Sequence, residues 1–125
     1  MAKLPAMHFY VGDWRKSPDV QSLDYHTRGV WFEMLCIMHE CDPYGKLMLN
    51  GEAMSNETIA KLLNLVNLEF ETCLNKLLKS GVASRDESNS SVMCRRMVRD
   101  AEIREKRKVA GKKGGNPNLI NPLVN

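Results

Sequence analysis

The side chains best suited to chemistry in this chain are cations gathered in one segment. Residues 95–113 hold nine Lys or Arg and three acids, so the segment carries +6, whereas the whole chain carries +3 and the remainder −3. Crowded like charge costs free energy unless a partner neutralises it, and nucleic-acid phosphate is the commonest such partner. A solvated helix face with a solubilising tail is the alternative. The candidate phosphate contacts are Arg95, Arg96, Arg99, Arg104, Lys106, Arg107, Lys108, Lys112 and Lys113.

Motifs of enzyme active sites do not occur in the sequence. Neither the phosphate-binding GxxxxGK(S/T) loop nor the dinucleotide-binding GxGxxG turn is found. His8, His26 and His39 have no adjacent Ser or Cys that would suggest a catalytic triad. Glu69 and Glu71 lie two positions apart on a predicted helix and so point to different faces, which disfavours a metal site. We expect no catalytic residue and no cofactor, and an enzyme such as a nuclease subunit is the least favoured hypothesis.

The four cysteines predict packing rather than metal binding. They show no paired CxxC spacing, and although Cys36 and His39 would be neighbours on a helix, Cys41 would lie on another side and a fourth ligand is not obvious. No run approaches the ~20 apolar residues that span a bilayer, and the N-terminal residues contain no signal-peptide core. We therefore expect a cytoplasmic protein with free thiols, no bound metal and no membrane contact.

The first elements of the chain are predicted from strand formers and turn residues. Residues 7–14 are rich in strand formers and predict an extended segment, and Ser17-Pro18-Asp19 predicts a turn. Ser22 or Asp24 could then cap a helix that runs to about residue 41, because apolar residues recur along it at the spacing of one helix face.

Two further helices are predicted by their caps. Ser55 is the expected N-cap of a second helix, which should end near residues 64–66. Asn67 is the expected N-cap of a third helix, and Gly81 is placed to end that helix as its C-terminal cap. The order of these elements leaves only a short turn between the second and third helices.

After the third helix the hydrophobic period changes. Residues 82–85 and 92–95 predict a β-hairpin with a polar tip, and residues 46–50 predict a short strand that would pair with it in a three-stranded sheet. A charged helix is expected from Val98 to about Ala110, broken by the glycines that follow.

This order of elements predicts a mainly α fold with a small β-ribbon, a winged helix-turn-helix. Three core helices would be followed by a hairpin wing and then by the basic helix. The expected domains are residues 1–97 for the winged helix, 98–113 for the basic helix and 114–125 for a disordered tail.

In DNA-binding winged helices, the third helix enters the major groove and the wing follows the backbone. Here the third helix offers Asn75, which could contact adenine, and Lys76 and Lys79, which could meet phosphate. It carries no Arg, and Glu69 and Glu71 offset its lysines. The alternative is that this surface faces solvent or a partner protein.

The chain also resembles a domain family of phage and prophage replication proteins. The likeness rests on Tyr10-Val11-Gly12-Asp13-Trp14, on Arg28-Gly29-Val30-Trp31 with Met34-Leu35, and on the closing run from Arg104 to Gly115 that contains Gly-Lys-Lys-Gly-Gly. It covers roughly residues 8–115. The N-terminal winged-helix domains of DnaD-like replisome organisers are similar at a greater distance.

The resemblance implies a replication-initiation or replisome-organiser protein that acts in a bacterial host cell. Such proteins bind origin DNA, expected here as duplex held by its phosphates, or help to load a helicase through that helicase or its loader. Related proteins often continue into a second domain beyond this stretch, so the resemblance implies DNA binding more directly than helicase loading. The competing hypothesis is a protein-interaction or oligomerisation module without direct DNA readout, because the third helix is near neutral and the chain holds eight methionines.

Overall fold

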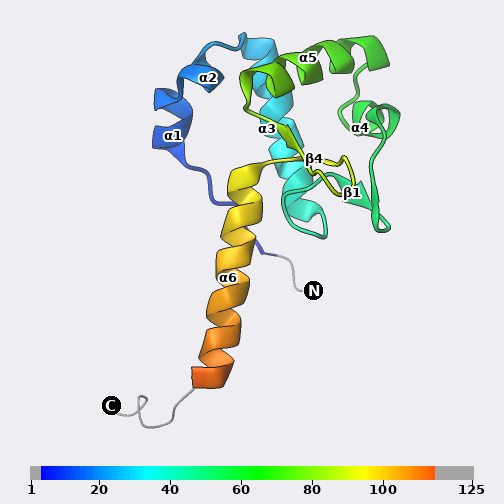
Figure 1. Ribbon diagram of the computed structural model, residues 1–125. Coiled ribbons are helices and arrows are strands. Elements are labelled where there is room, and N and C mark those ends of the chain that lie inside the picture. Colours follow the sequence, from blue (N-terminus) through cyan, green and yellow to red (C-terminus); the bar gives the residue numbers. More distant parts are fainter. Residues whose placement is uncertain (1–3, 115–125) are drawn as a thin grey trace.

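The computed structural model describes residues 4–114, which are mainly helical with two small antiparallel hairpins (Figure 1). This confirms the prediction of a mainly α chain with a small amount of β-structure. Of the predicted disordered tail, 114–125, Gly114 belongs instead to the last helix, and residues 115–125 lie outside the described residues. In chain order the elements are α1 (Val11–Lys16), α2 (Pro18–Gln21), α3 (Tyr25–Glu40), β1 (Met48–Leu49), β2 (Glu52–Ala53), α4 (Asn56–Leu62), α5 (Asn67–Ser80), β3 (Ser84–Arg85), β4 (Val92–Met93) and α6 (Arg95–Gly114).

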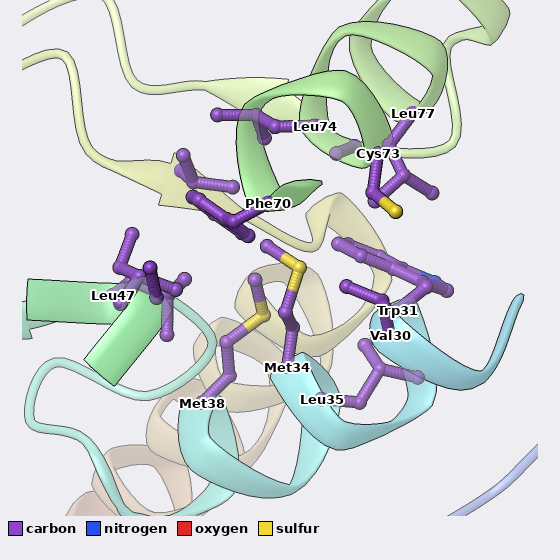
Figure 2. Close-up of a cluster of buried hydrophobic side chains, with 14 of the residues drawn as sticks. Val30, Trp31, Met34, Leu35, Met38, Leu47, Phe70, Cys73, Leu74 and Leu77 are labelled. Atoms are coloured by element: carbon purple, nitrogen blue, oxygen red, sulfur yellow. The ribbon is translucent and has the colours of Figure 1, made fainter. Parts of the chain in front are cut away.

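The core lies between α3 and α5 and is closed by α4 and the start of α6. Met34 and Met38 of α3 are fully buried against the α5 face that carries Phe70 and Leu77 (Figure 2). Met34 and Met38 are four positions apart and Phe70 and Leu77 are seven apart, which places each pair on one side of its helix. Removing apolar surface of this extent from water is the main stabilising term of the fold.

Local signals set the ends of α4 and α5, with small corrections. The Ser55 hydroxyl accepts a hydrogen bond from the Thr58 amide at 3.1 Å, as predicted for an N-cap. Gly81 ends α5 with a φ of +83°, which also confirms its predicted role. Asn67 is the first residue of α5 rather than its cap, since Val66 occupies the cap position. α4 ends at Leu62, earlier than predicted, and Asn64 turns the chain with a φ of +59°.

The prediction that residues 7–14 form an extended segment is only partly correct, because Val11–Lys16 forms α1. Among residues 4–114 no strand pairs with its backbone, whereas a helix satisfies those groups within the segment. Helix formation also brings the Trp14 ring to 5.3 Å from Phe9 and 6.4 Å from Phe32, measured between centroids. The predicted turn at Ser17 is a one-turn helix whose cap is the Ser17 side chain, bonded to the Val20 amide.

The predicted three-stranded sheet forms only in part. β1 pairs with β2 in a tight hairpin, where Asn50 and Gly51 both have positive φ, as in a two-residue turn of the primed type. The Asn-Gly signal for this turn stands in the sequence and was missed. The β3–β4 hairpin forms as predicted, and the segment before β1 pairs with β4 at a single bridge, Lys46 with Met93. At this bridge the Leu47 amide donates to the Val92 carbonyl at 2.8 Å and the Cys94 amide to the Gly45 carbonyl at 3.0 Å.

α6 differs from the predicted basic helix at both ends. It begins at Arg95 rather than Val98 and continues through Gly111 to Gly114. Met97 belongs to this helix and is buried in the core, so the expected boundary at residue 97 falls inside a helix rather than between two elements. A glycine inside a helix costs about 1 kcal/mol relative to alanine but does not stop it.

Candidate nucleic-acid interface

α6 is an arm that leaves the body of the molecule and extends away from it (Figure 1). Its 20 residues give a length of about 30 Å at the rise of an α-helix. We call residues 95–104 the root and residues 105–112 the distal arm. The root includes buried Met97 and half-buried Ala101 and Arg104, whereas every residue of the distal arm is exposed. The predicted phosphate contacts are therefore divided between two environments.

The root is clasped by the N-terminal segment. The Arg96 guanidinium donates to the Asp13 carboxylate at 2.5 Å, lies 3.6 Å from the centroid of the Tyr10 ring and is 3.8 Å from Asp100. Tyr10 in turn donates its hydroxyl proton to Asp100. The hydrogen bond that Arg96 donates to Asp13 raises the pKa of Arg96, and the bond that Tyr10 donates to Asp100 raises the pKa of Tyr10. Two carboxylates thus already neutralise Arg96, and a phosphate would have to compete with them.

Two other root arginines also make contacts within the chain. Arg95 donates to the Gly81 carbonyl at 3.1 Å, which ties the arm to the C-terminal end of α5. Arg104 lies 4.9 Å from the centroid of the Tyr44 ring, and the Tyr44 hydroxyl is bonded to His39 Nδ1 at 2.7 Å. Burial raises the pKa of Tyr44. Neither contact cancels the arginine charge, so Arg95 and Arg104 keep a positive charge that a phosphate could meet.

Five further cations of α6 have no partner among the described residues. In the part of the chain that the structure describes, no ion pair or hydrogen bond to another residue is formed by the side chains of Arg99, Lys106, Arg107, Lys108 or Lys112. The distal arm contains four of these cations and one acid, Glu105, so it carries +3. Lys113 lies in the last turn of the helix, but its side chain is outside the described part. A compact stretch of unneutralised charge therefore sits at the end of the molecule furthest from its core.

The predicted groove-facing residues of α5 are exposed but lie in mixed charge. Lys76 is 3.7 Å from Asp24, and together with Lys79 these residues line a hollow of about 340 Å³. A hydrogen bond from Thr27 lowers the pKa of Asp24, which keeps this carboxylate charged beside the lysines. Asn75 is exposed on the same helix. α5 and the end of the arm lie at opposite ends of the molecule in Figure 1, so the structure does not bring the two predicted sets together.

The β3–β4 hairpin does not add positive charge to the surface. Lys46 and Asp86 form an ion pair at 2.5 Å, and the Ser88 amide and hydroxyl also donate to Asp86. The hydrogen bond from Lys46 holds the pKa of Asp86 well below its usual range. Arg85 also contacts this loop and donates to the Ser90 carbonyl at 2.9 Å, so both cations help to fix the loop in place.

Sequence analysis missed the residues that hold the arm. Tyr10 and Asp13 meet the root across 90 and 83 positions, and Tyr44 stacks under Arg104. Tyr10 and Asp13 stand in the motif that supports the family resemblance, but no spacing rule pairs them with Arg96 or Asp100. Only the fold places them together.

Other classes of site find little support in the described part of the chain. Among residues 4–114, no group of three or more His, Cys, Asp or Glu side chains could hold a metal ion, and no helix is long and apolar enough to cross a membrane. His39, once weighed as a ligand, contacts the Leu4 carbonyl and Tyr44 instead. No family model, curated protein or solved structure matches this chain. The resemblance to phage replication proteins therefore stays a prediction.

Proposed function

We propose that this chain is a DNA-binding winged-helix domain of a phage or prophage replication-initiation protein, and that α6 is its phosphate-binding arm. The observation that carries this proposal is the distal arm, where four exposed cations face a single acid and none of the four is paired within the described residues. Unpaired cations of this kind favour binding to a polyanion such as nucleic acid, because the contact releases counterions from the phosphates.

The order of elements supports the winged-helix part of the proposal. α4 and α5 are joined by the four residues 63–66, α3 packs against α5, and the β3–β4 hairpin follows α5 directly. In this assignment α5 would be the groove helix and the hairpin the wing. Asn75, Lys76 and Lys79 would then contribute weak contacts, since the charges around them nearly cancel.

The number of cations on the distal arm predicts how strongly DNA binding should depend on salt concentration. Four phosphate contacts on duplex DNA correspond to a slope of about −4 for log K against log salt concentration, so affinity should fall about 100-fold between roughly 50 mM and 200 mM salt. A protein that binds through groove hydrogen bonds alone would show a shallower dependence.

The test uses the full chain and a short duplex in fluorescence anisotropy at two salt concentrations. The variant replaces Lys106, Arg107, Lys108 and Lys112 by Gln, which keeps side chains of similar length and good helix propensity. We expect salt-sensitive binding by the unchanged protein and a loss of at least about 10-fold in the variant at low salt. Circular dichroism checks that the helix is retained. Equal affinity of the two proteins would refute the arm as the binding element.

A second candidate function, protein interaction without DNA readout, is favoured by a different surface. Leu62, Val66 and Leu68 surround the α4–α5 turn and are 53%, 69% and 75% exposed. Exposed apolar side chains gathered in this way are typical of interaction sites. The partner would be a second copy of the chain or a replication protein such as a helicase or its loader. Light scattering on a size-exclusion column would detect self-association, which Leu68→Ser should weaken; a concentration-independent monomer that binds DNA would favour the first function.

A further inference from the structure

Four cations of α6 share one side of the helix. At about 100° per residue, and with Arg104 as reference, Lys108 lies at about 40°, Lys112 at about 80° and Arg107 at about −60°. We call these four residues the cationic stripe. They recur at positions three, four and eight apart, which is the spacing of one helix face. Each of the last three is exposed, and Arg104 is half-buried.

The opposite side of the arm has a different composition. Lys106 lies at about 200° from Arg104, and its neighbours on that side are Arg99 at about 220° and Glu102, Glu105 and Val109 at about 100° to 160°. All five are exposed, and together they carry no net charge. From Arg104 outward, the excess positive charge of the described residues therefore lies along one face of the helix.

This face continues the side by which the root packs on the body. Met97 and Ala101, at about 20° and 60° from the same reference, lie in line with Arg104 and Lys108. Met97 is buried, Ala101 is half-buried, and Arg104 lies over Tyr44. The stripe thus begins at Tyr44 and continues outward from the side of α6 that packs on the body.

We propose that the cationic stripe is a binding face for one strand of a DNA backbone, which would run along the side of the arm that packs on the body, with Arg104 nearest the body. This inference rests on the proposed function and narrows it to a face. An arginine stacked on an aromatic ring keeps its outer N–H groups free for phosphate, so the contact with Tyr44 orients Arg104 without removing it from the site.

The spacing of the stripe suits a phosphate backbone. Residues four apart on a helix rise about 6 Å, and phosphates of one strand recur about every 3.4 Å along the duplex axis, so each turn of the arm meets a phosphate of a strand running beside it. Gly111 lies on the same face between Lys108 and Lys112. A Cβ added there would meet no atom within 4 Å, so the helix backbone is open to close approach at this point.

The test compares lysines that differ only in the face they occupy. Lys108→Gln and Lys112→Gln each remove one charge from the stripe, and Lys106→Gln removes the same charge from the opposite side two positions away from Lys108. Binding of each full-length variant to a fluorescent duplex is measured across a salt series. We expect each stripe variant to bind about 3- to 10-fold more weakly and to lower the salt slope by about 0.9, whereas Lys106→Gln should change affinity by less than about twofold.

The possible outcomes separate the face from the function. Equal losses in all three variants would overturn the stripe, because they would show diffuse attraction to the arm, while leaving DNA binding by the arm intact. If the unchanged protein binds no duplex at either low or moderate salt, the proposed function itself fails. Binding to vesicles with anionic lipid but not to DNA would overturn both. Circular dichroism of each variant verifies that the helix persists, so that a loss of affinity reports the missing charge.

An independent measurement locates the DNA relative to the body. In an NMR titration with the same duplex, backbone amides of residues 42–46 and of the stripe should shift together, because the DNA would pass beside Tyr44. Shifts confined to the α4–α5 turn or to the β3–β4 loop would contradict this placement.

Discussion

The root and the distal arm belong to one helix and both carry excess positive charge, yet the protein uses them differently. The root carries +2 and the distal arm +3. In the root, Arg96 is held by two carboxylates and an aromatic ring, and Arg95 and Arg104 contact a carbonyl and a ring. In the distal arm the cations have no partner among the described residues. A cation with partners fixes geometry, and a cation without them is available to a ligand.

Reversing charge on the distal arm should produce the largest difference between the two regions. Lys108→Glu with Lys112→Glu changes the distal charge by four and should lower duplex affinity at low salt by about 100-fold or more. The free energy of unfolding should change little, since both side chains are exposed. Anisotropy and urea unfolding measure the two effects. A large loss of stability would show that the distal arm packs on something, contrary to its exposure.

An equivalent change in the root should lower the stability of the fold and leave the DNA affinity nearly unchanged. Arg96→Gln removes the contacts to Asp13, Tyr10 and Asp100, and because the side chain is 44% exposed we expect only about 1 kcal/mol of lost stability after solvent screening. This corresponds to a fall of about 4 °C in Tm. DNA affinity should change by less than about twofold. Differential scanning fluorimetry and anisotropy decide the matter, and a tenfold loss of affinity would place Arg96 among the binding residues.

A smaller change tests the contacts between the N-terminal segment and the root. Tyr10→Phe keeps the ring beneath Arg96 and removes only the hydroxyl that donates to Asp100. A hydrogen bond of this kind contributes about 1 kcal/mol or less at a partly exposed site. We therefore expect a Tm slightly below that of the unchanged protein but above that of Tyr10→Ala, which also loses the ring. Identical Tm values for both Tyr10 variants would show that the hydroxyl, not the ring, accounts for the contribution of Tyr10.

The Lys46–Asp86 pair extends the comparison to the β3–β4 hairpin. Here we expect the smallest effect on the stability of the fold. The pKa of Asp86 is lowered in the folded protein, so its contribution is present above the unfolded value of 3.8 and is lost as pH falls below it. When the free energy of unfolding is measured from pH 6 to pH 2, it should therefore fall more steeply in the unchanged protein than in Asp86→Asn. Parallel curves would mean that the pair does not stabilise the fold.

Local signals account for the elements that were predicted well. Ser55 and Gly81 cap helices because their bonds and backbone angles involve residues close in the chain, and the β3–β4 hairpin follows from two strand-forming runs around a polar tip. The missed β1–β2 hairpin also had a local signal in Asn50-Gly51. The N-terminal segment could not be predicted in this way, since its strand-forming residues fold as a helix where no strand is available to pair with them.

The sequence by itself determined the charge imbalance, the apolar faces of α3 and α5, and the helix caps. Each depends on composition or on residues within a few positions of one another. Only the tertiary structure decided which cations are neutralised, because Arg96 meets Asp13 across 83 positions, and it decided the direction in which the stripe faces, because Met97 and Tyr44 fix the rotation of α6 about its axis. Charge is a property of composition, but whether that charge is free for a ligand depends on the distant groups that folding brings beside it.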